Sequence, residues 1–243
     1  MEIFTGCLTE RGNYRNKNQD SAVCCRKKSR EDTFVVACVC DGIGSFEQSE
    51  IASRMLTEGI VRWFHGMEEL FPEQVDEEML VLDLEMTIEE LNELVYEYQE
   101  NKGIEIGCTM SILLLVNTSY YVFHVGDSRI YKATDGLYQI TRDEVAMVEV
   151  EGKIKSLLSN FIGKTEKLWM HKLSGMVEKN DLFLLGSDGL FKKLKFEDIR
   201  EMKRGFKNDK KVQAACKECI RLVLERGEKD NISCILIYVK SLF

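Results

Sequence analysis

The amino-acid sequence predicts an α+β fold with antiparallel sheets, built as one domain. Helical patterns come in blocks between blocks of strand-like segments, and this grouping favours antiparallel sheets over βαβ repeats. The chain has 243 residues, of which 44% are hydrophobic, and this is enough for one large core. No Pro/Gly/Ser-rich linker and no repeat of fixed period divides the sequence. We therefore expect residues 1–243 to form a single domain.

The first block contains three extended segments followed by two helices. Runs of apolar and β-branched residues predict strands at Ile3–Thr9, Ser21–Cys25 and Thr33–Cys40. Apolar residues at helical spacing predict helices over Glu50–Phe64 and Asp76–Tyr98, joined by a connection that contains Pro72. Both apolar stripes are expected to pack against the core, and the second helix carries acidic residues on its other face.

Strands then dominate until the last third of the chain. Four more are predicted at Thr109–Val116, Tyr120–Gly126, Ser128–Ala133 and Leu137–Ile140. A turn at Asn117–Ser119 joins the first two, whereas residues Asp143–Lys167 follow neither the helical nor the strand period. The later elements are two strands, two helices and a final strand, at Trp169–Ser174, Asp181–Ser187, Phe196–Met202, Lys211–Arg226 and Ile232–Val239.

Net charge and targeting signals narrow the classes of function. The formal net charge is −8, and an acidic surface repels the phosphate backbone, so we expect no nucleic-acid partner. The basic run Lys203–Lys211 lies between two helical patterns and is interpreted as a solvated loop. The N-terminus lacks a signal-peptide pattern, and no apolar run reaches membrane-spanning length. We expect a cytoplasmic monomer without a membrane partner.

The nine cysteines fit a reducing compartment. Four of them lie within apolar runs, where a free thiol behaves as a small hydrophobe: Cys38, Cys40, Cys108 and Cys234. Cys216 and Cys219 form an isolated CxxC on a helical pattern. We interpret this pair as core residues, because no second cysteine pair or nearby histidine completes a zinc site.

Four aspartates each stand at one end of a strand-like apolar run: Asp41, Asp127, Asp188 and Asp230. Acids gathered at strand ends predict a carboxylate-lined pocket at one edge of the β core, suited to Mg²⁺ or Mn²⁺. The alternative interpretation is that an Asp-Gly pair is only a turn. Asp135-Gly136, between two strands, is interpreted as such a hairpin turn. Asp41-Gly42 and Asp188-Gly189 are followed by helical patterns instead.

Seven segments of the chain, in this order, resemble the PP2C family of metal-dependent protein serine/threonine phosphatases, and the spacing around Arg15 is of the bacterial type. They are RGNYRNKNQDS, VCDGIGS, GCTMSILLLV, VGDSRIY, ITRD, LLGSDGLF and KDNISCILI, which together span Arg11 to Ile237. Each segment alone is a weak signal, but independent matches would not fall in the family's order. The resemblance implies two antiparallel sheets face to face with helices outside each, a four-layer αββα sandwich.

The resemblance also implies a two-metal centre that holds Mn²⁺ or Mg²⁺. Asp41 would bridge both ions, and the carbonyl of Gly42 would bind one of them. Asp188 and Asp230 would complete the protein ligands of the other ion. Asp127 matches the position that holds a third, weaker ion in bacterial members.

Three further residues are implied in catalysis. Arg15 matches the arginine that binds the substrate phosphate, and its planar fork suits two phosphate oxygens. Asp20 matches an acid that orients a metal-bound water, and Gln19 stands where many members carry Glu. Two cations about 3.5–4 Å apart can share one hydroxide that attacks phosphorus in line, so no phosphoenzyme is expected. The histidines are not needed for this chemistry, and His124, within a strand, is interpreted as structural.

The chain also departs from the family's pattern. Gln19 brings no charge, Ile43 stands where some members carry a histidine, and Ser45 replaces a frequent glycine. Only Glu144–Asn160 is available for the flap, which predicts a shortened flap and altered substrate access. The expected activity is hydrolysis of phosphoserine and phosphothreonine in phosphorylated proteins. The alternatives are a pseudophosphatase that binds phosphoproteins and a hydrolase of small phosphate esters.

Overall fold

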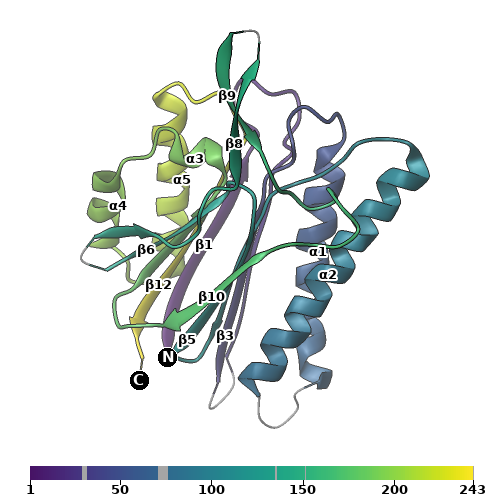
Figure 1. The fold of residues 1–243 in the computed structure, drawn as a ribbon. Helices are drawn as coiled ribbons and strands as arrows, with labels where there is room; N and C mark the ends of the chain where they lie inside the picture. The colour runs from purple at the N-terminus through teal and green to yellow at the C-terminus, as the bar shows by residue number, and fades with distance from the viewer. Residues whose placement is uncertain (29–31, 71–75, 135, 151, 243) are drawn as a thin grey trace.

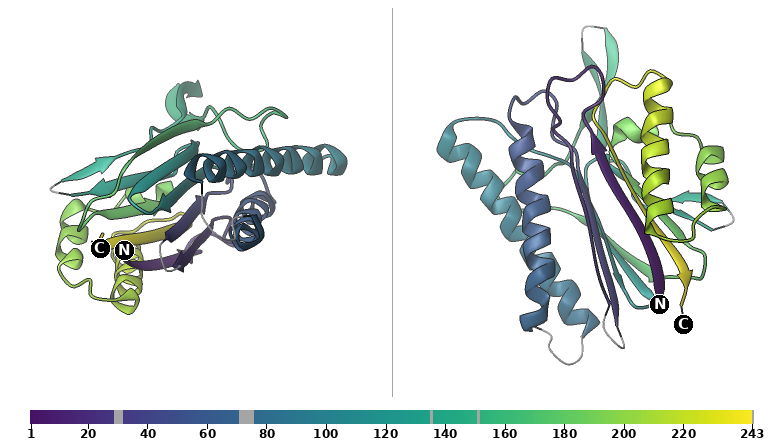
Figure 2. Two further views of the ribbon diagram at one scale, coloured as in Figure 1. Left: turned by 90° about the horizontal axis from the view of Figure 1, so that it is seen from below. Right: turned by 180° about the vertical axis from the view of Figure 1, so that it is seen from behind.

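Two antiparallel sheets pack face to face, and helices cover the outer side of each sheet (Figures 1 and 2). This computed structural model describes residues 1–28, 32–70, 76–134, 136–150 and 152–242. The predicted α+β sandwich with four layers is confirmed.

The first sheet has the strand order β1-β12-β11-β6-β7. Its strands are β1 (Glu2–Glu10), β12 (Ile232–Ser241), β11 (Leu182–Gly186), β6 (Arg129–Ala133) and β7 (Leu137–Gln139). The second sheet has the order β10-β5-β4-β3-β2. Its strands are β10 (His171–Met176), β5 (Ser119–Val125), β4 (Met110–Val116), β3 (Thr33–Cys40) and β2 (Ser21–Lys28). Every pair of neighbours in both sheets is antiparallel.

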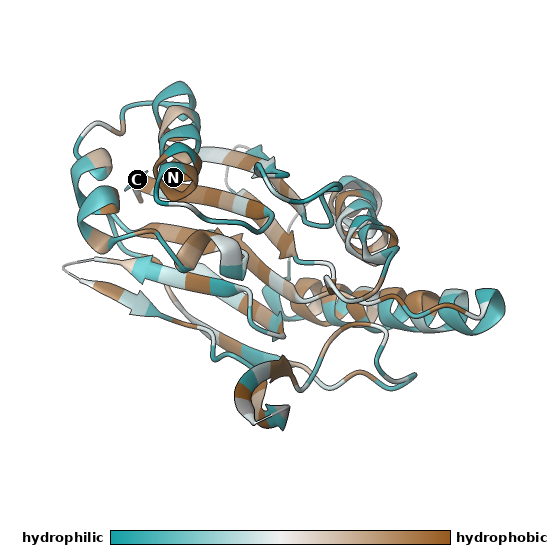
Figure 3. Cartoon of the chain, turned by 90° about the horizontal axis from the view of Figure 1, so that it is seen from above, coloured by the Kyte–Doolittle hydropathy of each residue, from teal (hydrophilic) through white to brown (hydrophobic). Residues whose placement is uncertain are grey.

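The central strands are apolar on both faces because each face meets a different core. In β3, Val35, Ala37 and Val39 pack between the two sheets. Val36 and Cys38 face the other way, onto the helices that cover the second sheet. This double burial explains why the strand shows a continuous apolar run rather than alternation. Figure 3 shows the result, with apolar strands inside and polar outer helix faces.

Helices α1 (Ser49–Leu70) and α2 (Glu77–Lys102) cover the second sheet. Asp76 caps α2 by accepting hydrogen bonds from two backbone N–H groups, and Gly103 ends it in the left-handed conformation with φ of 64°. Both helices continue beyond their predicted ends. Met67 extends the apolar stripe of α1, whereas the last turn of α2 lies past the final apolar residue of its stripe, Tyr98. Pro72 lies outside the described residues.

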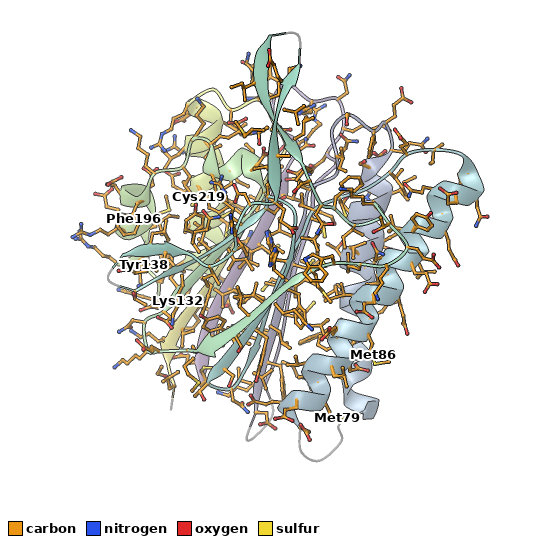
Figure 4. The ribbon with its side chains drawn as sticks, in the orientation of Figure 1. Met79, Met86, Lys132, Tyr138, Phe196 and Cys219 are labelled. Carbon is orange, nitrogen blue, oxygen red and sulfur yellow. The ribbon has the colours of Figure 1, made fainter. Side chains whose placement is uncertain are left out.

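The first sheet is covered by α4 (Phe196–Lys203) and α5 (Asp209–Glu225), and α3 (Asp188–Phe191) is a single turn after β11. Gly6 of β1 allows α5 to approach closely, since a Cβ there would lie 2.8 Å from the backbone of Gln213. Cys216 and Cys219 are buried between α5 and the sheet, as interpreted from the sequence; Cys219 is labelled in Figure 4.

The stretch Asp143–Lys167 contains a hairpin of β8 (Val145–Val150) and β9 (Lys153–Leu158), which pair with each other. Its side chains are exposed on both faces, including Met147 at 69% and Ile154 at 72%. The strand sequences VAMVEV and KIKSLL also lack the regular apolar alternation that marks a half-buried strand. The predicted flap falls on this hairpin, and its shortness stays a prediction.

Two predicted turns join neighbouring strands in the structure. Strands β6 and β7 pair as the hairpin expected around Asp135-Gly136, although Asp135 itself lies outside the described residues. Asn117 has a φ of 51° at the turn between β4 and β5, as predicted. Within the described ranges, no helix combines the length and apolar character needed to cross a membrane.

We expect the core between the sheets to dominate stability. Leu113 of β4 is fully buried there, so Leu113→Ala should lower the free energy of unfolding by about 2–5 kcal/mol. Leu82→Ala provides a matched control on the outer face of α2, where Leu82 is 49% exposed and Met79 and Met86 are also exposed (Figure 4). The control should change stability by less than about 0.5 kcal/mol. Urea denaturation followed by circular dichroism measures both, and equal losses would contradict the predicted core.

Candidate active site

The four strand-end aspartates line one pocket at the end of the sandwich from which the β8–β9 hairpin projects (Figure 1). Asp41 follows β3 of the second sheet, and Asp127 lies where the chain passes from β5 to β6. Asp188 follows β11, and Asp230 precedes its antiparallel neighbour β12. The pocket measures about 130 Å³. Antiparallel pairing therefore brings together acids from distant parts of the sequence, as predicted.

The Asp41-Gly42 pair is not a hairpin turn. The backbone N–H of Asp41 donates to the hydroxyl of Thr109 at 3.0 Å, and the N–H of Thr109 donates back to the carbonyl of Asp41 at 2.8 Å. Gly42 donates to the carbonyl of Gln19 at 3.1 Å, and a Cβ on Gly42 would lie 2.7 Å from that oxygen. The Asp41 backbone is thus fixed by two other segments, and only glycine fits beside it.

A second close approach fixes Asp188 beside Asp230. A Cβ on Gly189 would lie 2.2 Å from the carbonyl oxygen of Asn231, so the start of α3 packs directly on the start of β12. This contact needs a residue without a side chain. The Asp-Gly sequence at this position therefore serves close packing rather than a turn.

Asp20 is buried behind the pocket rather than in its lining. Its exposed fraction is 6%, and its Oδ2 accepts hydrogen bonds at 2.7 Å from the hydroxyls of Ser187 and Ser233. The other oxygen, Oδ1, is buried and has no hydrogen-bond donor. Burial raises the pKa of Asp20 to about 6, against the opposing effect of the two serines. Its predicted role in orienting a water stays a prediction.

The pocket concentrates negative charge. Burial raises the pKa of Asp41 well above its ordinary value, and repulsion from Asp20, Asp188, Asp127 and Asp230 raises it further. The pKa of Asp127 is raised to about 6, first by burial and then by repulsion from neighbouring acids. Carboxylates forced together in this way gain stability from a proton or a cation placed among them.

Two cationic side chains already contact these carboxylates. Arg15 approaches Oδ1 of Asp230 with its Nε at 3.0 Å and its Nη2 at 2.8 Å. The ammonium of Lys192 lies 2.6 Å from Oδ2 of Asp188 and 3.5 Å from Oδ2 of Asp230. The sequence interpretation missed Lys192, which reads as a surface residue of a charged helical stretch.

The donor set fits a hard divalent cation. Carboxylate oxygens and a backbone carbonyl are the ligands that Mg²⁺ and Mn²⁺ prefer, and the repulsion on Asp41 favours added positive charge. Among the described residues, no three His, Cys, Asp or Glu side chains already gather as a compact metal cluster. The acids surround the pocket instead, and two of them are bonded to Arg15 and Lys192.

Asn231 organises the loop that carries Arg15 and Gln19, a role that the sequence did not reveal. Its Oδ1 accepts from the backbone N–H of Gln19 at 2.9 Å. Its Nδ2 donates to the carbonyls of Arg11 at 2.8 Å and Lys17 at 3.0 Å. One amide side chain thus ties both ends of this loop to the start of β12.

Two of the residues that depart from the family pattern also lie at the pocket. The side chain of Gln19 donates through Nε2 to the carbonyl of Phe46 at 2.8 Å, and Ile43 lines the pocket. Leu158, at the end of β9, brings the hairpin to its rim. The base of the hairpin is held by Glu144, whose Oε2 accepts from the backbone N–H of Gly126 at 2.8 Å.

The structure accounts for two other predicted features without catalysis. Asp143 of the ITRD segment forms an ion pair with Arg129 at 2.6 Å, which joins the VGDSRIY and ITRD segments. His124 is buried, bonds Ser111 through Nδ1 at 2.9 Å, and lies 3.0 Å from the carbonyl of Arg142 through Nε2. Burial lowers its pKa, which agrees with the structural interpretation.

Comparison with known proteins gives matches along nearly the whole chain. The family model described as Protein phosphatase 2C matches residues 13–236. The chain is similar to the protein phosphatase PhpP of Streptococcus pneumoniae, with 24% identity over 98% of this chain and 97% of PhpP.

Solved structures of low sequence identity share the fold. The serine/threonine phosphatase Stp1 of Staphylococcus aureus has a TM-score of 0.82 and 20% identity, covering 99% of this chain and 96% of Stp1. The serine/threonine phosphatase PstP/Ppp of Mycobacterium tuberculosis has a TM-score of 0.78 and 20% identity, covering 98% of this chain and 99% of that one.

The raised pKa of Asp127 predicts a pH-dependent effect of Asp127→Asn on chelated protein. Between about pH 4 and 6 the folded state keeps a proton that the unfolded state releases, so Asp127 lowers the free energy of unfolding as pH rises. The variant removes this loss, and should be more stable than wild type by about 3 kcal/mol at pH 7. Its advantage should vanish as pH falls to 4.

Urea denaturation in EDTA across pH 4–7.5 measures this difference. A stability difference that stays constant with pH would contradict the raised pKa of Asp127, because a packing change alone does not titrate.

Proposed function

The chain belongs to the protein phosphatase 2C family, and we propose that it hydrolyses phosphoserine and phosphothreonine in proteins with the help of Mn²⁺ or Mg²⁺. The observation that carries this proposal is the meeting of Arg15 with four carboxylates in one pocket. An anion-binding guanidinium beside a cation-binding acid cluster is the arrangement that transfer of a phosphoryl group to water requires.

Five residues are proposed to hold the metal ions. Asp41 would bridge two ions, with the carbonyl of Gly42 on one of them and Asp188 and Asp230 on the other. Asp127, which lines the same pocket, would hold a third. Bound there, divalent cations lower the pKa of a water molecule and offset the charge of the phosphate. The repulsion that raises the pKa of Asp41 supports this assignment.

Arg15 is proposed to bind the substrate phosphate. Its guanidinium lies at the mouth of the pocket, 44% exposed, and a Cβ on Gly44 would be 3.5 Å from it. The same group now bonds Asp230, so it can reach the pocket without a large movement. Two parallel N–H donors would orient the phosphate and stabilise the negative charge that develops on its oxygens.

The surrounding side chains limit which groups can donate or accept protons during hydrolysis. Ile43 offers no titratable group, so the departing alkoxide would take its proton from water. Asp20, buried behind the pocket with an unpaired Oδ1, is proposed to position Asp41 and to orient the attacking water through it. None of the described residues that line the pocket is a serine, cysteine or histidine, and the hydroxyl of Thr109 is bonded to the backbone N–H of Asp41, so we expect water to attack phosphorus without a phosphoenzyme.

An open groove beside the pocket favours a polypeptide substrate over a small phosphate ester. It measures about 740 Å³ and shares Arg15, Gln19 and Gly44 with the pocket. A phosphorylated side chain could enter the pocket while the flanking chain lies in the groove. Free cysteines suit a reducing cytoplasm, and we expect the protein to act there as a monomer.

Purified protein with Mn²⁺ should release phosphate from a phosphothreonine peptide, and chelation should abolish the release. Asp188→Ala should lower kcat/KM by at least about 100-fold, since the variant removes an acid assigned to the metal ions. Parallel assays with p-nitrophenyl phosphate and nucleotides compare substrate classes.

Each alternative function predicts a different result in these assays. Tight phosphopeptide binding without turnover in any metal would indicate a phosphoprotein-binding module, and faster turnover of nucleotides than of peptides would indicate a small-ester hydrolase. Phosphate release that survives both chelation and Asp188→Ala would contradict the proposed metal chemistry.

Substitution of Arg15 tests the phosphate contact. Arg15→Ala should lower kcat/KM for the phosphopeptide by about 10- to 100-fold, because it removes charge-assisted hydrogen bonds to the phosphate. Arg15→Lys should recover only part of the loss, since lysine lacks the planar fork. Arg11→Ala, in the same loop but outside the pocket lining, is the control and should stay near wild type. Equal activity of Arg15→Ala and wild type would refute this role.

A further inference from the structure

The side chain of Lys192 turns back from the end of α3 onto two carboxylates that line the pocket. Its ammonium lies 2.6 Å from Oδ2 of Asp188, four residues earlier, and 3.5 Å from Oδ2 of Asp230. Asp188 and Asp230 come from different elements and are 28% and 26% exposed. One ammonium thus bridges two half-buried acids that repel each other.

We propose that Lys192 is a resident counter-cation of this pocket, and that a divalent ion must displace it to bind Asp188 and Asp230. The proposal rests on the metal site assigned above and concerns its regulation. Lys192 would weaken the binding of that ion and would hold the acid pair together when the ion leaves.

Competition follows from the shared oxygens. Hard divalent ions bind oxygen at about 2.0–2.6 Å, and Mg²⁺ at the short end of this range. Oδ2 of Asp188 cannot keep an ammonium at 2.6 Å while it also coordinates such an ion along the same direction. Like charges of the ammonium and the ion also repel at this separation. Asp230 is bonded through both oxygens, because Arg15 contacts its Oδ1.

The alternative is an ordinary surface ion pair between residues four apart on a helix, which contributes little. Lys192 is 46% exposed, so its bond to Asp188 alone would fit that description. Its reach to Asp230 does not, because Asp230 lies on the β12 side of the pocket and belongs to the predicted ligands. Lys193, the next residue, is exposed and offers a comparison with the same charge.

Binding of Mn²⁺ to the protein, measured by isothermal titration calorimetry without substrate, tests the proposal. Lys192→Met removes the ammonium and keeps much of the side-chain volume, and it should bind Mn²⁺ about tenfold more tightly than wild type. Lys193→Met, with the same change in net charge, should stay within about twofold of wild type. Lys192→Arg keeps the cation and should also stay close to wild type.

Thermal unfolding supplies a second readout that a merely structural lysine would not produce. In EDTA, Lys192→Met should unfold at a lower temperature than wild type, since the acid pair loses its counter-charge. In saturating Mn²⁺ it should equal or exceed wild type. A structural role predicts the same loss in both conditions, and such a result would overturn the proposal.

Other outcomes are also decisive. Unchanged or weaker Mn²⁺ binding by Lys192→Met would overturn the competition. Binding by Lys192→Arg that is as tight as binding by Lys192→Met would also overturn it. If Lys192→Met does not fold, Lys192→Gln takes its place with the same expectations. Wild type that binds no Mn²⁺ would overturn the metal site itself, whereas wild-type binding with an unaffected variant overturns only the role of Lys192.

Discussion

Mutual repulsion among the carboxylates at one end of the sandwich is the constraint on which the rest of the site depends. Burial and four neighbouring acids raise the pKa of Asp41 well above its ordinary value. Behind it, one carboxylate oxygen of Asp20 has no hydrogen-bond donor. Such a cluster is unfavourable unless protons or cations offset it. The cores on both sides of each sheet supply the stability that lets the fold hold the acids together.

The acids are held by backbone contacts, and this leaves their side chains free to exchange cationic partners. Gly42 packs on the carbonyl of Gln19, Gly189 packs on the carbonyl of Asn231, and the amide of Asn231 fixes the loop of Arg15. None of these contacts uses a carboxylate of the pocket. Arg15 and Lys192 can therefore leave Asp230 and Asp188 without disturbing these backbone contacts. This suits a site that would bind and release ions and phosphate.

The sequence predicts the sandwich and the strand-end acids well, because both leave a signal in order and periodicity. Asp41 and Asp188 are recognisable because helical patterns, not returning strands, follow their Asp-Gly pairs. Asn231 could not be predicted, since its bonds to Arg11 and Lys17 join residues more than 200 positions apart. The β8–β9 hairpin also escaped prediction, because strands exposed on both faces carry no apolar period.

Among the unusual side chains near the pocket, the one that changes its net charge has the largest effect on the acids. Gln19 and Ile43 suggested a protein that binds phosphate without turnover, yet neither adds charge. Gln19 is anchored on the carbonyl of Phe46, and Ile43 is only part of the wall. Lys192 adds a positive charge in contact with two acids assigned to metal. Because the proposed hydrolysis would depend on bound ions, a side chain that competes with them would affect activity before any step at phosphorus does.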